Sequence, residues 1–182
     1  MPKILYIEDD LQNNIATIKK FFAPILKDKR IIKALDELAN TKRVYAEDVI
    51  RACSLSSFLD IVHTFPLALE RIIHSHKSYD LILIDRNLSN SQYDIELEQL
   101  IAWMGEIGMS NMQDRILDYF EREGDLLLKV LLRINPAYKD KTYFLTANVS
   151  DALRQPAELQ NMLDLDSFTG DHIIEKGSKK RK

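Results

Sequence analysis

The sequence has few of the features that tie a protein to an oxidising compartment. Among its 182 residues there is one cysteine, Cys53, so no disulfide can form within the chain. Disulfides persist mainly in oxidising compartments, and we therefore expect a reducing, cytoplasmic environment. A free cysteine usually packs as a small apolar side chain, so Cys53 is predicted to be buried and inert.

Long apolar runs and an excess of one charge are also missing. No stretch approaches the roughly 18 apolar residues that a membrane-crossing helix needs. Lys3 precedes only a short apolar run, Ile4 to Ile7, which does not make a signal peptide. The net charge of -3 and the sequence pI near 5.8 provide no general attraction to nucleic acid or to anionic membranes. We expect a soluble protein whose partners include neither a membrane nor nucleic acid.

What the sequence does contain is a set of short apolar segments without alternation. Apolar residues make up 46% of the chain, which is enough for a sizeable core. Parallel strands that are covered on both faces have this uniform apolar character. The predicted strands are Lys3 to Ile7, Leu59 to Phe65, Asp80 to Ile84, Thr142 to Thr146 and His172 to Glu175.

Apolar residues at helical spacing lie between these strands. The stripes are Leu11, Ile15, Ile18 and Phe22; Leu67, Leu69, Ile72 and Ile73; and Leu127, Val130, Leu131 and Ile134. Strands that alternate with amphipathic helices indicate right-handed βαβ units and an α/β sheet. We expect one domain over residues 1–182, with helical insertions at about 24–57 and 89–123 and a basic tail at 177–182.

Polar residues follow the ends of the predicted strands. In chain order they are Glu8, Asp9, Asp10, Asp85, Thr146 and Lys176. Because the carboxyl ends of parallel strands lie at one edge of the sheet, these groups are expected to meet there. Clustered carboxylates repel one another unless a cation is present, and hard oxygen ligands suit Mg²⁺. An aspartate beside such an ion can act as a nucleophile toward phosphorus.

The chain resembles the response-regulator receiver domains of two-component signalling. The matching segments are KILYIEDD, YDLILIDRNL, YFLTAN and HIIEK, each at a predicted strand end and in the family's order. The resemblance implies a flavodoxin-like, doubly wound, five-stranded parallel sheet in the order 2-1-3-4-5. It covers the chain outside the two insertions.

The resemblance also implies roles for single residues. Asp85 is expected to be the phosphoacceptor, Thr146 the switch hydroxyl and Lys176 the lysine that contacts the phosphoryl group. Mg²⁺ is expected on Glu8, Asp9, Asp85 and the backbone carbonyl of Asn87, with Asp9 the direct ligand of the acidic pair. The residues expected to modulate the site are Asp10, Asn87, Ala147 and Asn148.

The implied function is phosphoryl transfer to Asp85 from the phosphohistidine of a sensor histidine kinase or phosphotransfer protein. Mg²⁺ would be the cofactor, and phosphorylation would act as a conformational switch. Such a protein is a signalling receiver and catalyses at most its own phosphorylation and dephosphorylation.

Several features depart from the family pattern. Gly177 stands where the family usually has a proline with a cis peptide bond, and Ile173 stands where it has an aromatic switch residue. No clear last helix follows the fifth strand, and a long segment follows Ser89. These departures favour a second hypothesis, a receiver-like interaction module that no longer switches. Its added helices would bind an output partner or a second copy of the chain.

Other readings of these residues remain open. Glu8 to Asp10 could form a solvated loop or a helix N-terminus. A phosphatase with an aspartyl nucleophile is a weaker third hypothesis, because Asn87 cannot transfer the proton that such enzymes require. Core filling is favoured over a partner groove for the methionines Met104, Met109 and Met112.

Overall fold

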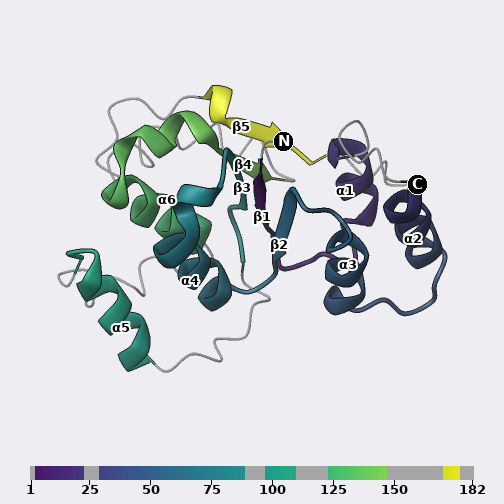
Figure 1. Ribbon diagram of the computed structural model, residues 1–182, viewed down its shortest axis with the longest axis horizontal. Coiled ribbons are helices and arrows are strands. Elements are labelled where there is room, and N and C mark those ends of the chain that lie inside the picture. Colours follow the sequence, from purple (N-terminus) through teal and green to yellow (C-terminus); the bar gives the residue numbers. More distant parts are fainter. Residues whose placement is uncertain (1–2, 23–28, 89–96, 110–122, 147–169, 177–182) are drawn as a thin grey trace.

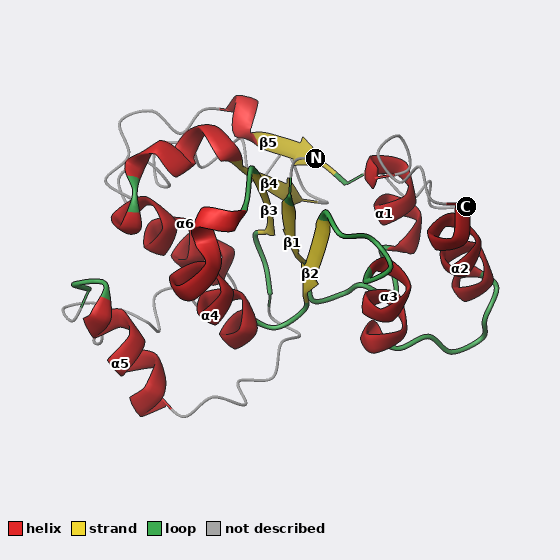
Figure 2. Cartoon of the chain, viewed as in Figure 1, coloured by secondary structure: helices red, strands yellow, loops and turns green. Residues whose placement is uncertain are grey.

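The computed structural model is an α/β protein built on a five-stranded parallel sheet (Figures 1 and 2). It describes residues 3–22, 29–88, 97–109, 123–146 and 170–176. The strands are β1 (Ile4–Ile7), β2 (Leu59–Val62), β3 (Leu81–Asp85), β4 (Thr142–Thr146) and β5 (Ile173–Glu175). Their order is β2-β1-β3-β4-β5, so the expected flavodoxin-like topology is confirmed.

Some of the described helices lie within the two segments that were expected to be insertions. They are α1 (Ile15–Phe22), α2 (Lys29–Ala39), α3 (Ala46–Cys53), α4 (Phe65–Ser75), α5 (Leu97–Glu106) and α6 (Glu123–Ile134). Short 3-10 helices cover His76–Ser78, Pro136–Lys141 and Gly170–His172. None of the helices in this described part of the chain is both long and apolar enough to cross a membrane.

The sheet separates two apolar cores, as expected for strands that are covered on both faces. Leu5 and Ile7 of β1 face a core that also contains residues of α4, α5 and α6. Ile4 and Tyr6 face the opposite core, which is closed by α1, α2 and α3. Figure 1 shows these two groups of helices on either side of the sheet. The two helices of the first insertion therefore extend the layer that α1 begins.

The predicted strand from Leu59 to Phe65 runs too far. β2 ends at Val62 because Thr64 caps α4, where its Oγ1 accepts a hydrogen bond from the Leu67 N–H at 3.4 Å. Pro66 lies in the first turn, a position that needs no amide donor. Leu67 itself is 44% exposed, so its assignment to the apolar stripe of this helix is wrong.

The methionines of α5 and the turn after it fill the core, as predicted. Met104 and Met109 are buried among residues of α4 and α6, and Trp103 packs against the same cluster. Met112 lies outside the described residues. Cys53 is also buried, and burial raises the pKa of its thiol to about 12. The thiol therefore stays protonated near neutral pH.

Candidate metal centre

Three carboxylates converge at the carboxyl edge of the sheet. Ile7, the last residue of β1, lies opposite Ile84 of β3, so the next residues along the two strands, Glu8 and Asp85, are level with each other. Glu8, Asp9 and Asp85 are all buried, and one oxygen from each lies within 4.8 Å of the others. The parallel register thus brings together the acidic residues that the sequence places at two strand ends.

Lys176 supplies a buried positive charge to this cluster. Its Nζ lies 2.5 Å from Oε2 of Glu8 and 2.8 Å from Oδ2 of Asp85. The residue follows β5 directly, and its backbone N–H donates to the carbonyl oxygen of Thr146 at 2.9 Å. Thr146 is buried at the end of β4. The last described residue of the chain is thereby held at the same edge as the three carboxylates.

The ionisation of Asp85 reflects this crowded environment. Burial raises the pKa of Asp85 most, the charge of Glu8 raises it further, and Lys176 lowers it, with a net value of about 8. Burial by itself lowers the pKa of Lys176, but Asp85 and Glu8 outweigh this effect and the pKa is raised. A divalent cation would favour the ionised form of Asp85, because an opposite charge stabilises a carboxylate.

Glu8 is held by several hydrogen bonds. The Tyr6 hydroxyl donates to its Oε2 at 3.0 Å, and the Asp10 N–H donates to its Oε1 at 3.2 Å. Burial, followed by the neighbouring Glu8, raises the pKa of Tyr6, so the hydroxyl keeps its proton. The sequence analysis did not identify Tyr6. Its two-residue spacing from Glu8 was the available signal, since residues i and i+2 of a strand share a face.

The other predicted site residues are not among the three clustered carboxylates. The carboxylate of Asp10 accepts hydrogen bonds from the side chains of Gln12 and Asn13, at 2.9 and 2.7 Å, so it orders the turn before α1. Asn87 is exposed in the segment after β3, and its role as a carbonyl ligand stays a prediction. Ala147 and Asn148, like the basic tail, lie outside the described residues.

The first turn of α6 contacts the segment that follows Asp85. Arg86 and Asp125 form a two-pronged ion pair, with Nε–Oδ1 at 3.0 Å and Nη2–Oδ2 at 3.1 Å. Glu123 accepts a hydrogen bond from the Leu88 N–H. These contacts join residues that lie far apart in the sequence, and the sequence analysis missed them. A local signal was the polar run EREGD, whose last three residues form the first turn of an apolar helix.

The donors at this edge fit a hard divalent cation. Carboxylate oxygens are the ligands that Mg²⁺ prefers, and it is usually bound through one or two of them, with water or phosphate completing its shell. The combined negative charge of the three carboxylates exceeds the single positive charge of Lys176. A further positive charge would therefore reduce the repulsion between the carboxylates. The cluster could therefore hold a metal ion such as Mg²⁺.

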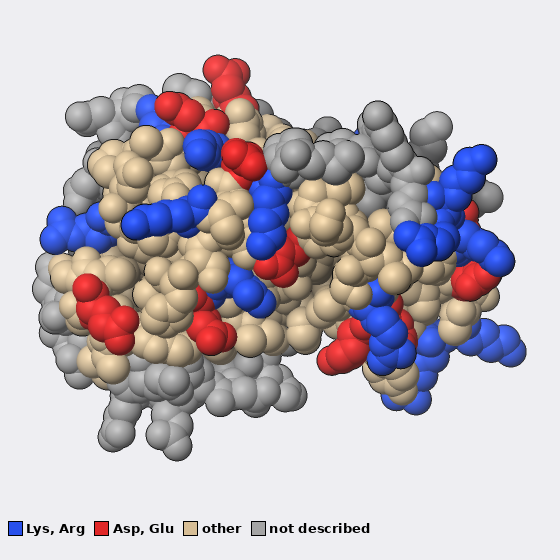
Figure 3. Space-filling model, viewed as in Figure 1, with Lys and Arg blue, Asp and Glu red and all other residues tan. Residues whose placement is uncertain are grey.

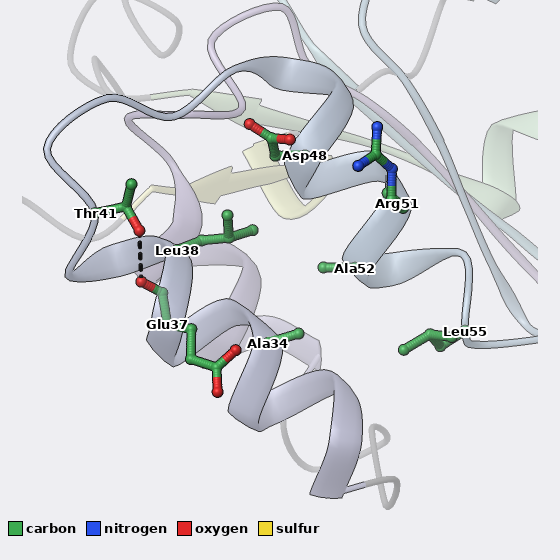
Figure 4. Close-up of a pocket in the computed structure, with 8 residues that line it drawn as sticks. All are labelled: Ala34, Glu37, Leu38, Thr41, Asp48, Arg51, Ala52 and Leu55. Atoms are coloured by element: carbon green, nitrogen blue, oxygen red, sulfur yellow. Dashed lines mark hydrogen bonds between the residues drawn. The ribbon is translucent and has the colours of Figure 1, made fainter.

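Two surface features lie apart from the acidic cluster. A hollow of about 480 Å³ separates α2 from α3 (Figure 4) and is lined by Ala34, Glu37, Leu38, Thr41, Asp48, Arg51, Ala52 and Leu55. Lys and Arg side chains gather around α1 and α2 (Figure 3). The exposed basic residues of this region are Lys20, Lys29, Arg30, Lys33, Lys42, Arg43 and Arg51. The small net charge of the chain thus hides an uneven distribution.

Fold and site define a flavodoxin-like α/β protein with a buried acidic cluster that could hold a metal ion. Comparisons of the chain with protein-family models, with curated proteins and with solved structures each found no match. The resemblance to receiver domains rests on the strand order and on the residues at the carboxyl edge.

Proposed function

We propose that this protein is a receiver that accepts a phosphoryl group on Asp85. The observation that supports this most directly is the meeting of Asp85 with Glu8, Asp9 and Lys176 at one edge of the sheet. The donor would be the phosphohistidine of a sensor histidine kinase or of a phosphotransfer protein. Mg²⁺ would be required for the transfer.

The residues of the edge have distinct tasks in this proposal. Asp9, Asp85 and the carbonyl of Asn87 would hold the ion. Both oxygens of Glu8 already accept hydrogen bonds or pair with Lys176. Glu8 would therefore lie next to the direct ligands of the ion and would not be one of them. The bound ion would supply positive charge to the phosphoryl oxygens.

The transfer itself needs a nucleophile and a cation that stabilises the negative charge of the transferred phosphoryl group. An oxygen of Asp85 attacks phosphorus, the P–N bond breaks, and the histidine nitrogen leaves with the electron pair. Lys176, which lies 2.8 Å from Oδ2 of Asp85, is close enough to pair with a phosphoryl oxygen on that carboxylate. The Thr146 hydroxyl, at the end of the adjacent strand, would be drawn toward the same group.

A small phosphodonor tests this proposal. The protein incubated with acetyl phosphate and Mg²⁺ should gain one phosphate by intact mass, and Asp85→Asn should gain none. Asp140→Asn is the matched control, because Asp140 is exposed and lies before β4 on a different part of the chain. A wild-type mass that is unchanged with every donor, with or without Mg²⁺, would refute the proposal.

A second candidate is the interaction module that no longer switches. Ile173, which is half-buried on β5 at the position of the family's aromatic switch residue, favours it. The phosphate mimic beryllofluoride separates the two candidates. With Mg²⁺ it should shift amide resonances beyond the Asp85 pocket, into α3 and α5, if the protein switches. Shifts confined to the pocket would favour the non-switching module.

The added helices are the proposed surface for an output partner or a homodimer. Deletion of Asn90 to Glu123 is expected to abolish association, but it would also remove the buried Met104 and Met109 and the Glu123 carboxylate that accepts the Leu88 amide, so it is no clean test of phosphorylation. Substitution of Leu55, which is 52% exposed beside the hollow between α2 and α3, gives a cleaner test. Leu55→Asp should reduce self-association or partner binding in light scattering, and unchanged association would exclude this surface.

A further inference from the structure

We infer that Glu123, in the first turn of α6, is a positioning residue for the bound ion. It would act through the peptide group that carries the carbonyl of Asn87. This inference rests on the proposed function, because it takes that carbonyl to be a metal ligand. It adds to the site a residue that lies on a helix and not at the end of a strand.

The argument begins with the hydrogen bond between Leu88 and Glu123. The backbone N–H of Leu88 donates to Oε2 of Glu123 at 3.3 Å. That N–H and the C=O of Asn87 belong to the same planar peptide group. None of the described peptide bonds is cis, and in a trans peptide the N–H and the C=O point in opposite directions. A carboxylate that fixes the N–H therefore fixes the direction of the Asn87 carbonyl.

The preceding peptide group is held in the same way. The N–H of Gly124 donates to the carbonyl oxygen of Arg86 at 3.1 Å. Asn87 thus lies between two peptide groups that are both anchored to consecutive residues of α6. With both neighbouring planes fixed, the backbone at Asn87 has little freedom to change the direction of its carbonyl.

Burial strengthens this anchor. Glu123 is 2% exposed and Leu88 is fully buried, so water does not compete strongly for the bond. Hydrogen bonds to an ionised acceptor are stronger than neutral ones, and a low dielectric strengthens them further. A negative charge on the N–H side of a peptide also polarises its carbonyl, which makes the oxygen a better cation ligand.

Two further contacts hold α6 against the chain at this point. The Arg86–Asp125 pair is two-pronged and almost completely buried. A Cβ atom on Gly124 would lie 2.3 Å from the carbonyl oxygen of Asp85 and 2.8 Å from Cα of Arg86. The helix can approach the phosphoacceptor backbone this closely only because residue 124 is glycine.

A merely structural role for Glu123 makes a different prediction. If Glu123 only satisfies a buried amide, its loss lowers stability and leaves cation affinity unchanged. If it orients the Asn87 carbonyl, its loss weakens cation binding. Outer-shell partners of metal ligands typically contribute 10–100-fold in affinity.

The test compares Glu123→Ala with Glu123→Gln. Mg²⁺ affinity is measured by calorimetric titration, and exchange of the Leu88 amide by NMR. We expect Glu123→Ala to bind Mg²⁺ about 10–100-fold more weakly and to exchange the Leu88 amide faster. Glu123→Gln, whose amide oxygen can accept the same hydrogen bond but carries no negative charge, should restore both properties in part.

The wild-type protein offers a second measurement that does not depend on the alanine variant folding. Addition of Mg²⁺ should shift the Leu88 amide resonance and slow its exchange, because the coupling between ion and peptide group is reciprocal. The Leu67 amide, which is bound by the cap of α4, serves as the control and should not respond.

The possible failures can be told apart. If the wild type binds Mg²⁺ and Glu123→Ala binds it equally well, this inference is wrong and the proposed metal site stands. The inference is also wrong, and the metal site also stands, if the wild type binds Mg²⁺ and the Leu88 amide resonance and exchange rate do not change. If the wild type binds no Mg²⁺, the proposed metal site is itself wrong, and the inference falls with it.

Discussion

Lys176, which follows the edge strand β5, and Asp85, the last residue of the central strand β3, form a buried ion pair with Nζ and Oδ2 2.8 Å apart. The same ammonium group lies 2.5 Å from Glu8. One lysine therefore pairs with two of the three clustered carboxylates. The stability of the metal-free protein should depend on it.

Removal of this lysine leaves buried carboxylates without their partner. We expect Lys176→Ala to lower the free energy of unfolding by about 3–5 kcal/mol in the presence of a chelator, as measured by urea denaturation. Lys33→Ala is the control, because Lys33 is exposed and lies 3.7 Å from Glu37. Such surface pairs contribute about 0–1 kcal/mol. Similar losses in the two variants would contradict the importance of the buried pair.

Binding of Mg²⁺ should raise the melting temperature. A ligand at about 100 times its dissociation constant adds about 2.7 kcal/mol. For a chain of this size that corresponds to a shift of roughly 5–10 °C. Asp9→Ala should abolish most of the shift, since Asp9 belongs to the three-carboxylate cluster. Exposed Asp140, replaced by alanine, should leave it unchanged. An equal shift in Asp9→Ala would exclude Asp9 as a ligand.

Gly124 should not tolerate a side chain. The Cβ of Gly124→Ala would meet backbone atoms of Asp85 and Arg86, which cannot rotate away as a flexible side chain could. We expect a loss of about 1–3 kcal/mol or more in urea denaturation.

Gly105 provides a control with the opposite sign. It is an exposed residue of α5 and does not have the positive φ found at Gly108. Gly105→Ala should stabilise the protein by about 0.5–1 kcal/mol, because alanine loses less backbone entropy in a helix. A neutral Gly124→Ala would contradict the close approach of α6 to β3.

Tyr79 should make stability sensitive to alkaline pH. Its buried hydroxyl donates to Oδ2 of Asp60 at 2.5 Å, and burial, followed by this bond, raises the pKa of Tyr79 above its ordinary value. Because the pKa is higher in the folded state, the contribution is fully present below about pH 10 and is lost as the pH rises further. Tyr79→Phe should cost about 1.5 kcal/mol near neutral pH.

The pH dependence of that difference is the decisive measurement. The gap in unfolding free energy between wild type and Tyr79→Phe should shrink above pH 10, because the hydroxyl then ionises in the unfolded chain while the folded state keeps its proton. Tyr45→Phe, at a position that is 52% exposed, should show no such trend. A gap that stays constant up to pH 12 would show that folding does not raise the pKa of the Tyr79 hydroxyl.

The parallel strands and the position of the acidic cluster could both be predicted from the sequence, whereas the strand order was implied only by the resemblance to receiver domains. The uniform apolar runs before Glu8 and Asp85 identify buried parallel strands, and such strands collect their carboxyl ends at one edge. The helices α2 and α3 also lie within the segment at about 24–57 that was expected to be helical. These features depend on patterns within a few residues. Phe65 was misassigned because a cap and a proline begin α4 earlier than its apolar pattern suggests, and Leu67 because it is exposed on that helix.

By itself, then, the sequence determined which acidic residues lie at the strand ends and which strands deliver them, because hydrophobic periodicity and chain order are local properties. Only the tertiary structure decided how those residues meet. The pairing of Lys176 with both Glu8 and Asp85, and the contact of Glu123 with Leu88, join distant parts of the chain. The pKa of Asp85 near 8 likewise results from burial and from neighbours that assemble only when the sheet forms.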